Sequence, residues 1–324
     1  MGLVTGDGKR VVMLHHGHFV EAAYHAMSSL TAALEGRSDL SWDAETLERL
    51  NANWIDVLWS NDGDDGRLGA EIMRAHDAEV TGGHDVRFNH RLAAILADKL
   101  GGALPLPRSA TTQQLAGIAA KALVDSFVGA YGQRERFSYF DTLGAASLAG
   151  LKAYVTGTVL GQIAEEGRGT AMQELTFVFG HTHKPLETRL ALPGLRVPPA
   201  VYNSGGWDLD TPMFGTRLGA AALFIDDALN VASLRLCNVP QHDADATGPG
   251  AAPTPVYVST ADGPVGTPGL VNPLADALDA VLKATAADWS AFTKAAAAGY
   301  LDKQSFIVDR LRAGDGCGTG GISR

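Results

Sequence analysis

The sequence has little of what several protein classes require. Only two cysteines occur in 324 residues, and Cys237 and Cys317 lie too far apart in sequence to suggest a disulfide framework or a thiolate zinc site. Basic residues are also outnumbered, since 26 Lys and Arg stand against 36 Asp and Glu, for a formal net charge of −10. No global positive field therefore exists to attract nucleic acid or an anionic membrane surface.

Long hydrophobic runs are absent as well. The most apolar helical stretch, around Leu148 to Ile163, contains Lys152 and is shorter than the roughly 20 residues that a membrane span requires. The first residues include no apolar segment of signal-peptide length. We therefore expect a cytoplasmic protein with no membrane span and with its thiols free.

What the sequence does contain is a set of short strand-like runs separated by a long helical stretch. The first run is Arg10 to His16, and the next convincing one begins at Glu174. A gap of some 150 residues is far longer than an ordinary loop, so residues of about 19–172 are predicted to form an inserted helical cap. Apolar spacing predicts helices there at 19–34, 43–59, 68–79, 89–100, 111–130 and 140–163.

Strand patterns dominate the later part of the chain. They predict strands in 174–180, 188–192, 200–206, 217–226 and 229–236, the last two as a hairpin across the turn at Asp226–Ala228. The resulting organisation is a main domain over 1–240, a Pro- and Gly-rich linker over 241–271, helices over 272–312 and a disordered tail over 313–324. Within the linker, PVYVST is a candidate edge strand.

Two groups of histidines follow predicted strands. In FVFGHTHKP, His181 and His183 stand two apart, so alternation sends both imidazoles to one side while Thr182 points away. His15, His16 and His18 follow the first strand in the same manner. Neutral imidazole is a common ligand of zinc, iron and manganese-type ions, so the two groups are predicted to meet around a metal. The alternative is that these are loop histidines satisfied by backbone carbonyls.

Three segments together, VVMLHHGHF, FVFGHTHKP and AVYNSGGW, resemble the later motifs of the calcineurin-like metallophosphoesterase superfamily. The resemblance implies an α/β fold, a four-layer αββα sandwich, here with a large helical insertion and a C-terminal helical extension. It also implies two divalent ions of the Mn, Fe or Zn type. The implied reaction is hydrolysis of a phosphate mono- or diester, in a small molecule or a nucleotide, through a metal-bridging hydroxide.

The same resemblance assigns roles to individual residues. His15, with His16 as the one-residue alternative, would be the strand-end metal ligand. His181 would bind the same metal and His183 the other one, while His18 would be a supporting or substrate-contacting group. Asn203 and Gly205 would belong to the supporting strand.

The chain also departs from the family pattern. The family begins with Asp-x-His, Gly-Asp-x-x-Asp and Gly-Asn-His-Asp/Glu, and only 14 residues precede His15 here. We therefore expect a truncated chain that represents the later part of the catalytic domain, with its activity in doubt. Two alternatives stay open: a degenerate, non-catalytic metal-binding or scaffold protein, and a different metal-dependent hydrolase that takes Asp or Glu ligands from the helical stretch. The acidic run NDGDDG, 61–66, lacks calcium-loop spacing and is predicted to be a turn.

Overall fold

The structure is a computed structural model, and it describes residues 2–21, 43–54, 142–166, 171–206, 219–236 and 255–296, with 24, 25, 28, 29, 31, 32, 35 and 298. The helices predicted at 68–79, 89–100 and 111–130, the NDGDDG run, both cysteines and the tail over 313–324 lie outside these residues. The chain divides into two compact units: Met1–His18 with Glu135–Arg324, and Phe19–Arg134.

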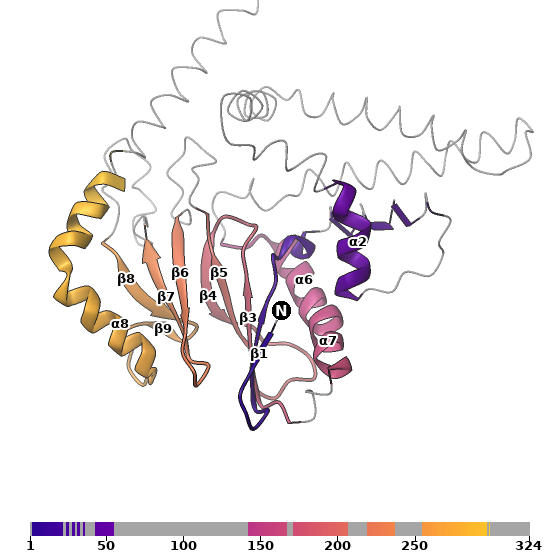
Figure 1. Ribbon diagram of the computed structural model, residues 1–324, viewed down its shortest axis with the longest axis horizontal. Coiled ribbons are helices and arrows are strands. Elements are labelled where there is room, and N and C mark those ends of the chain that lie inside the picture. The colour runs from indigo at the N-terminus through magenta and orange to yellow at the C-terminus, as the bar shows by residue number, and fades with distance from the viewer. Residues whose placement is uncertain are drawn as a thin grey trace, which may run out of the picture. The chain divides into compact units, whose positions relative to one another are not determined.

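The first unit is built on a five-stranded sheet. Its strands lie in the order β1-β2-β3-β5-β4 (Figure 1), with bounds Gly2–Val4, Arg10–Leu14, Glu174–Phe179, Ala200–Ser204 and Pro185–Arg189 in that order. The central strands β2, β3 and β5 run parallel, and the outer strands β1 and β4 pair antiparallel. Parallel central strands bring their carboxyl ends to one edge of the sheet, which places the two histidine groups at the same edge.

A second sheet is antiparallel throughout and has the order β6-β7-β8-β9. The hairpin of β6 (Ala220–Ile225) and β7 (Val231–Leu236) confirms the prediction made from alternating residues. The next strands, β8 (Tyr257–Thr260) and β9 (Gly263–Pro264), lie inside the segment predicted as a linker over 241–271. That segment therefore contributes two strands to the sheet, as its PVYVST run suggested for one of them.

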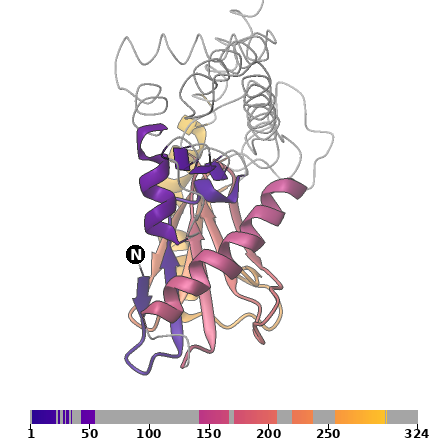
Figure 2. The same cartoon turned by 90° about the vertical axis from the view of Figure 1, so that its right-hand side faces the viewer.

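Helices cover the outer side of each sheet. α6 (Ala145–Tyr154), a π-helical segment (Val155–Val159) and α7 (Leu160–Glu165) follow one another without a break and lie against the five-stranded sheet (Figure 2). The Tyr154 ring packs edge-on against Phe177 of β3, with 6.2 Å between the ring centroids. The helix predicted at 140–163 is thus confirmed. It packs on the first sheet and belongs to the first unit, whereas we expected it to be part of an insertion that reaches residue 172.

On the other side, α8 (Pro273–Ala284) packs against β7 and β8. Its Asn272 cap accepts a hydrogen bond from the N–H of Ala275 at 3.0 Å, and Pro273 occupies the first turn, where no N–H is needed. The residues buried between this helix and the second sheet are Ala220, Ala232, Leu234, Leu236, Val256, Val258 and Ala275. The order of layers in this unit is therefore helix, sheet, sheet, helix (Figure 1).

The core between the sheets is formed by alternate residues of the strands that face each other. Val12, Ala200 and Tyr202 of the first sheet pack against Val231 of β7 and Leu229 just before it. One charged pair is buried here too, since the carboxylate of Glu187 on β4 lies 2.8 Å from the guanidinium of Arg235 on β7. Burying one large apolar side chain stabilises a fold by roughly 1.5–3 kcal/mol, so this layer is a main source of stability.

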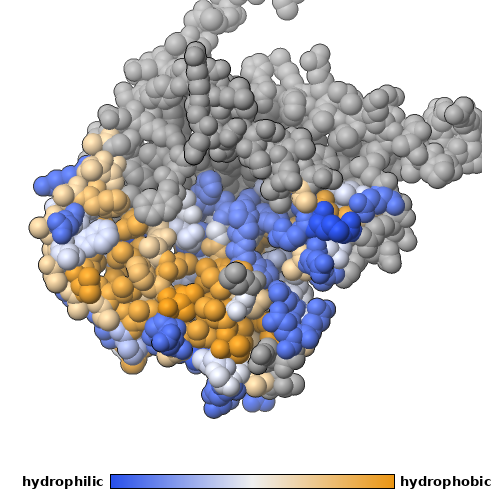
Figure 3. Space-filling view, viewed as in Figure 1, coloured by the Kyte–Doolittle hydropathy of each residue, from blue (hydrophilic) through white to orange (hydrophobic). Residues whose placement is uncertain are grey.

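Both sheets have an edge strand with exposed apolar side chains. Figure 3 shows a continuous hydrophobic area over β6 and the strands beside it. Phe224 of β6 and Leu3 and Val4 of β1 are among the exposed large hydrophobic residues. β1 and β6 stand at the ends of their sheets, and Ala220 at the start of β6 also forms a single antiparallel bridge with Gly205.

The second unit is described mainly by α2 (Ala44–Trp54), which confirms the amphipathic helix predicted from Asp43 onward. The Asp43 carboxylate accepts the N–H of Thr46 at 2.8 Å and so caps the helix. One face of α2 buries Leu47 and Leu50, together with the Asn51 amide. No helix in the described part of the chain combines the length and hydrophobicity that a bilayer crossing demands.

Candidate histidine site at the strand ends

The two histidine groups meet where β2 and β3 end. These strands pair in parallel with Leu14 opposite Val178. The pairing continues beyond them, because the N–H of His15 donates to the carbonyl of Val178 at 3.0 Å and the N–H of Gly180 donates to the carbonyl of His16 at 2.9 Å. The chain then turns away through a short 3-10 segment, His18–Val20. Segments about 165 residues apart in sequence are therefore held side by side.

Three imidazoles form a cluster there, which we call the imidazole cluster: His16, His18 and His181. The ring centroid of His16 lies 5.2 Å from that of His18 and 5.2 Å from that of His181, and His18 lies 6.2 Å from His181. The Nδ1 atoms of His16 and His18 are 3.0 Å apart, so one of them donates to the other. The predicted convergence of imidazoles from two strands is present in the fold.

The environment of His16 favours the neutral ring. Burial, followed by the charges of His181 and His183, lowers the pKa of His16 to about 4. Burial penalises the charged imidazolium, and nearby rings that can themselves become positive add to the penalty. A neutral imidazole keeps a lone pair on one nitrogen, which is the form that binds a metal ion or accepts a proton.

His15, the residue that the resemblance put first, lies elsewhere. Its Nδ1 is 2.8 Å from the hydroxyl of Tyr154 on α6, and its ring packs edge-on against Phe177 with centroids 5.6 Å apart. The cause is strand alternation: Val12 and Leu14 face the core between the sheets, so the residues between and after them face the helix. The position that reaches the imidazole cluster is His16, the one-residue alternative.

The loop that carries His181 and His183 has an unusual backbone. Both residues have positive φ, 67° and 57°, and left-handed backbone at a non-glycine residue costs on the order of 1–3 kcal/mol. Thr182 between them is buried, but all three residues lie in a loop beyond the end of β3, so the strand alternation from which we placed His181 and His183 on one side does not extend to them. Such conformations persist only where surrounding contacts determine them.

Those contacts come from Asn203 on β5. Its Nδ2 donates to the carbonyl of Gly180 and to the hydroxyl of Thr182, each at 2.8 Å. Its Oδ1 accepts the N–H of Gly205 at 2.8 Å. Gly205 has φ of 68°, and an added Cβ would collide with the carbonyl oxygen of Gly219. The Asn-Ser-Gly segment that the resemblance placed on the supporting strand thus supports the Gly180–His183 loop directly.

The donor atoms gathered here suit part of a metal site. Imidazoles are good ligands for zinc, iron and manganese-type ions. Among the described residues, however, no three His, Cys, Asp or Glu side chains are arranged to hold a metal ion together. The described residues therefore fit a share of the ligands of one ion, and they do not supply the two complete sites that the family resemblance implies.

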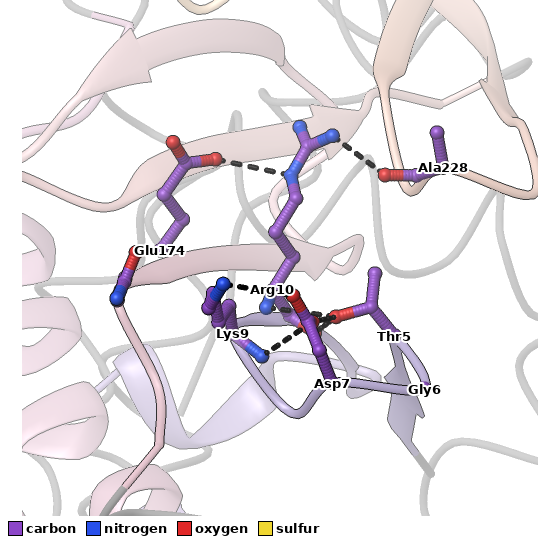
Figure 4. A pocket seen from close by; sticks show the side chains of 8 residues that line it. Thr5, Gly6, Asp7, Lys9, Arg10, Glu174 and Ala228 are labelled. Atoms are coloured by element: carbon purple, nitrogen blue, oxygen red, sulfur yellow. Dashed lines mark hydrogen bonds and ion pairs between the residues drawn. The ribbon is translucent and has the colours of Figure 1, made fainter.

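A cavity lies at the opposite end of the first sheet, before β2 begins (Figure 4). The guanidinium of Arg10 lines it, with Nε 3.0 Å from the Glu174 carboxylate and Nη1 2.5 Å from the carbonyl of Ala228. Asp7 accepts from the Thr5 hydroxyl at 2.7 Å and from the N–H of Lys9 at 3.1 Å. The two carboxylates of this cavity, Asp7 and Glu174, balance the two cations, Lys9 and Arg10. We therefore interpret it as a structural contact between the two sheets.

Sequence reasoning overlooked Tyr154 and the full role of Asn203. Tyr154 lies in a helix that we predicted as part of the insertion, and nothing in its spacing indicates a contact with His15. Asn203 was assigned to the supporting strand, but its three bonds depend on how β3 and β5 pair.

Comparisons with known proteins add nothing to this geometry. Searches with models of protein families, with characterised proteins and with solved structures found no match to the chain.

Proposed function

We propose that the chain is a metal-dependent phosphoesterase, or the later part of one, whose histidines at the strand ends hold catalytic metal. One observation carries the proposal: His16 and His18 meet His181 at the shared edge of two parallel strands. The helix, sheet, sheet, helix order of the first unit supports it as well. The substrate class that follows is a phosphate mono- or diester, in a small molecule or a nucleotide.

The residues have separable tasks in this proposal. His16 and His181 supply imidazole donors from the two strand ends, and His18 and His183 beside them are further candidates. Bound divalent ions in such an enzyme supply Lewis acidity toward the phosphoryl group and a source of hydroxide. They also give local positive charge to a protein with a net charge of −10. Carboxylate ligands for a second ion have to come from outside the described residues.

Metal binding is the first test. Protein purified without chelator is titrated with Zn²⁺ and Mn²⁺, with bound metal measured by mass spectrometry and affinity by competition with a chromogenic chelator. His16→Ala and His181→Ala are expected to weaken binding at least about tenfold, as loss of groups in or around a metal site does. His15→Ala is the matched control, because it removes a neighbouring imidazole that faces Tyr154. If His16→Ala and His181→Ala bind the metal as tightly as the parent chain and His15→Ala do, the proposed site is wrong.

Hydrolysis is the second test. The Mn²⁺-loaded chain is assayed with bis(p-nitrophenyl) phosphate and p-nitrophenyl phosphate, the simplest diester and monoester probes. Release of nitrophenol is expected to depend on added metal and to fall in His16→Ala, His181→Ala and His183→Ala. If the chain binds metal through these residues but releases no nitrophenol, the phosphoesterase assignment of this chain is wrong.

A second candidate is a non-catalytic metal-binding or scaffold protein. It rests on the same cluster, because His16, His18 and His181 lie together whether or not the chain carries out catalysis. The two tests separate the candidates, since this protein would bind one ion through His16 and His181 and would hydrolyse neither ester. If the chain binds no metal at all, the scaffold role is the one candidate that is left.

A further inference from the structure

The histidine loop between β3 and β4 depends on contacts from outside itself. Two of its residues, His181 and His183, have left-handed backbone. Glycine adopts that conformation far more readily than histidine does. Within the loop, the N–H of Thr182 donates to the carbonyl of Gly180 at 2.8 Å, which gives a tight turn but does not fix it relative to β5. The Gly180 N–H bond to the His16 carbonyl anchors the start of the loop, and a contact from β5 is needed to hold the residues that follow it.

Asn203 provides that contact with its entire side chain. It is fully buried, and it uses both amide hydrogens and the amide oxygen: two bonds to the loop and one to the N–H of Gly205, each 2.8 Å long. This combination requires two donors and one acceptor on a short side chain. Asparagine meets the requirement and aspartate does not, because a carboxylate has no hydrogen to donate.

We propose that Asn203 is a positioning residue that holds the Gly180–His183 loop so that the His181 ring stays against His16 and His18. The inference rests on the proposed function, in which these imidazoles are metal donors. It deepens that function by naming the group that pre-organises them, acting through backbone and hydroxyl contacts and not through the metal. Hydrogen bonds behind a set of ligands commonly tune metal affinity in this manner.

The test compares Asn203→Ala and Asn203→Asp with Asn51→Ala. Asn51 is the matched control because it is also fully buried, and its Nδ2 donates to two backbone carbonyls, those of Tyr24 and Leu47, in the other unit. Both Asn203 variants are expected to bind Zn²⁺ roughly 10–100-fold more weakly than the parent chain. Asn51→Ala is expected to bind like the parent. Thr182→Ser, which keeps the hydroxyl acceptor, is expected to retain the affinity.

A metal-independent readout accompanies the titration. In the parent chain, nuclear Overhauser contacts between the His16 and His181 rings are expected from the 5.2 Å centroid distance, and they should vanish in Asn203→Ala but persist in Asn51→Ala. If the folded Asn203→Ala protein keeps these contacts, the positioning role is wrong. If the contacts vanish while His16→Ala and His181→Ala bind Zn²⁺ like the parent, the positioning role stands and the proposed metal site fails.

Discussion

Tyr202 and Asn272 donate hydrogen bonds to the same acceptor, the carbonyl oxygen of Val231. The Tyr202 hydroxyl lies 3.0 Å from that oxygen, and the Asn272 Nδ2 also lies 3.0 Å from it. Tyr202 belongs to the first sheet, Val231 to the second, and Asn272 caps α8. One backbone carbonyl thus connects three of the four layers, and the N–H of Ala261 completes the arrangement by donating to the Tyr202 hydroxyl at 3.0 Å.

Tyr202 is expected to make the fold sensitive to alkaline pH. Burial raises the pKa of its phenol to about 12, so the folded state favours the neutral form. The stabilisation is complete below the unfolded pKa of about 10 and is lost as pH rises from about 10 toward 12, up to about 2–3 kcal/mol. The check is the urea midpoint of the parent and Tyr202→Phe between pH 8 and 11.

Tyr202→Phe is expected to be less stable than the parent at pH 8, by about 1–2 kcal/mol, because it loses two buried hydrogen bonds. The difference should shrink at pH 11, where the parent has lost part of its phenol contribution and the variant has none to lose. Two curves that stay parallel across the range would show that Tyr202 does not titrate with the fold.

Asn272 is expected to contribute in two separable ways. Asn272→Ala removes both the cap on the Ala275 N–H and the bond to Val231, and should cost about 1–2 kcal/mol of unfolding free energy. Asn272→Asp keeps an oxygen to cap the helix but cannot donate to Val231, so it should fall between the parent and the alanine variant. Chemical denaturation followed by circular dichroism measures all three proteins. Equal stability of the aspartate and alanine variants would mean that the cap contributes nothing.

The buried pair of Glu187 and Arg235 gives a third prediction. Arg235→Met leaves the Glu187 carboxylate buried without its cation, and removing one partner of a buried pair typically costs about 3–5 kcal/mol. Glu187→Leu combined with Arg235→Met should cost less than the sum of the two single changes, because no lone charge remains. A double-mutant cycle in urea provides the measurement, and strict additivity would contradict the coupling.

Gly205 and Gly194 form a matched pair for a fourth prediction. Both have positive φ, 68° and 84°. At Gly205 an added Cβ meets the Gly219 carbonyl and the Pro185 ring, whereas at Gly194 it meets nothing within 4 Å. Gly194→Ala should cost about 1–2 kcal/mol from backbone strain alone. Gly205→Ala should cost clearly more. It should also weaken Zn²⁺ binding, because the Gly205 N–H donates to Asn203, the residue that holds the Gly180–His183 loop. Similar losses in both variants, measured by thermal unfolding, would remove steric crowding as the cause.

Much of the first unit was readable from the sequence, and the reasons are local. β2, β3, β5 and the β6–β7 hairpin follow from short β-branched and apolar runs bounded by turn residues. In the second unit, Asp43 marks the start of α2 because its side chain caps a free N–H group. β1, by contrast, was missed, because Gly2–Val4 is three residues long and gains its strand conformation only by pairing with β2.

The site was harder to predict than the strands. The run Val11–Leu14 is apolar on both faces, as expected for a strand covered on both sides, so it carries no alternation that would tell His15 from His16. Only the layers decide, since one side faces α6 and the other faces the second sheet. The end of the insertion was hard to predict for a similar reason. An apolar helix such as α6 has the same sequence pattern whether it covers a sheet or belongs to a helical cap.

The cavity around Arg10 has a consequence at the far end of its strand. A slip of β2 by one residue along β3 would send every side chain of β2 to the opposite face, and His15 would then take the place of His16. Arg10 opposes such a slip, because it stands opposite Glu174, pairs with its carboxylate and is tied to the Ala228 carbonyl of the other sheet. The ion pair at the start of β2 thus adds to the burial of Val11, Val12 and Met13 in fixing which of two adjacent histidines reaches the imidazole cluster.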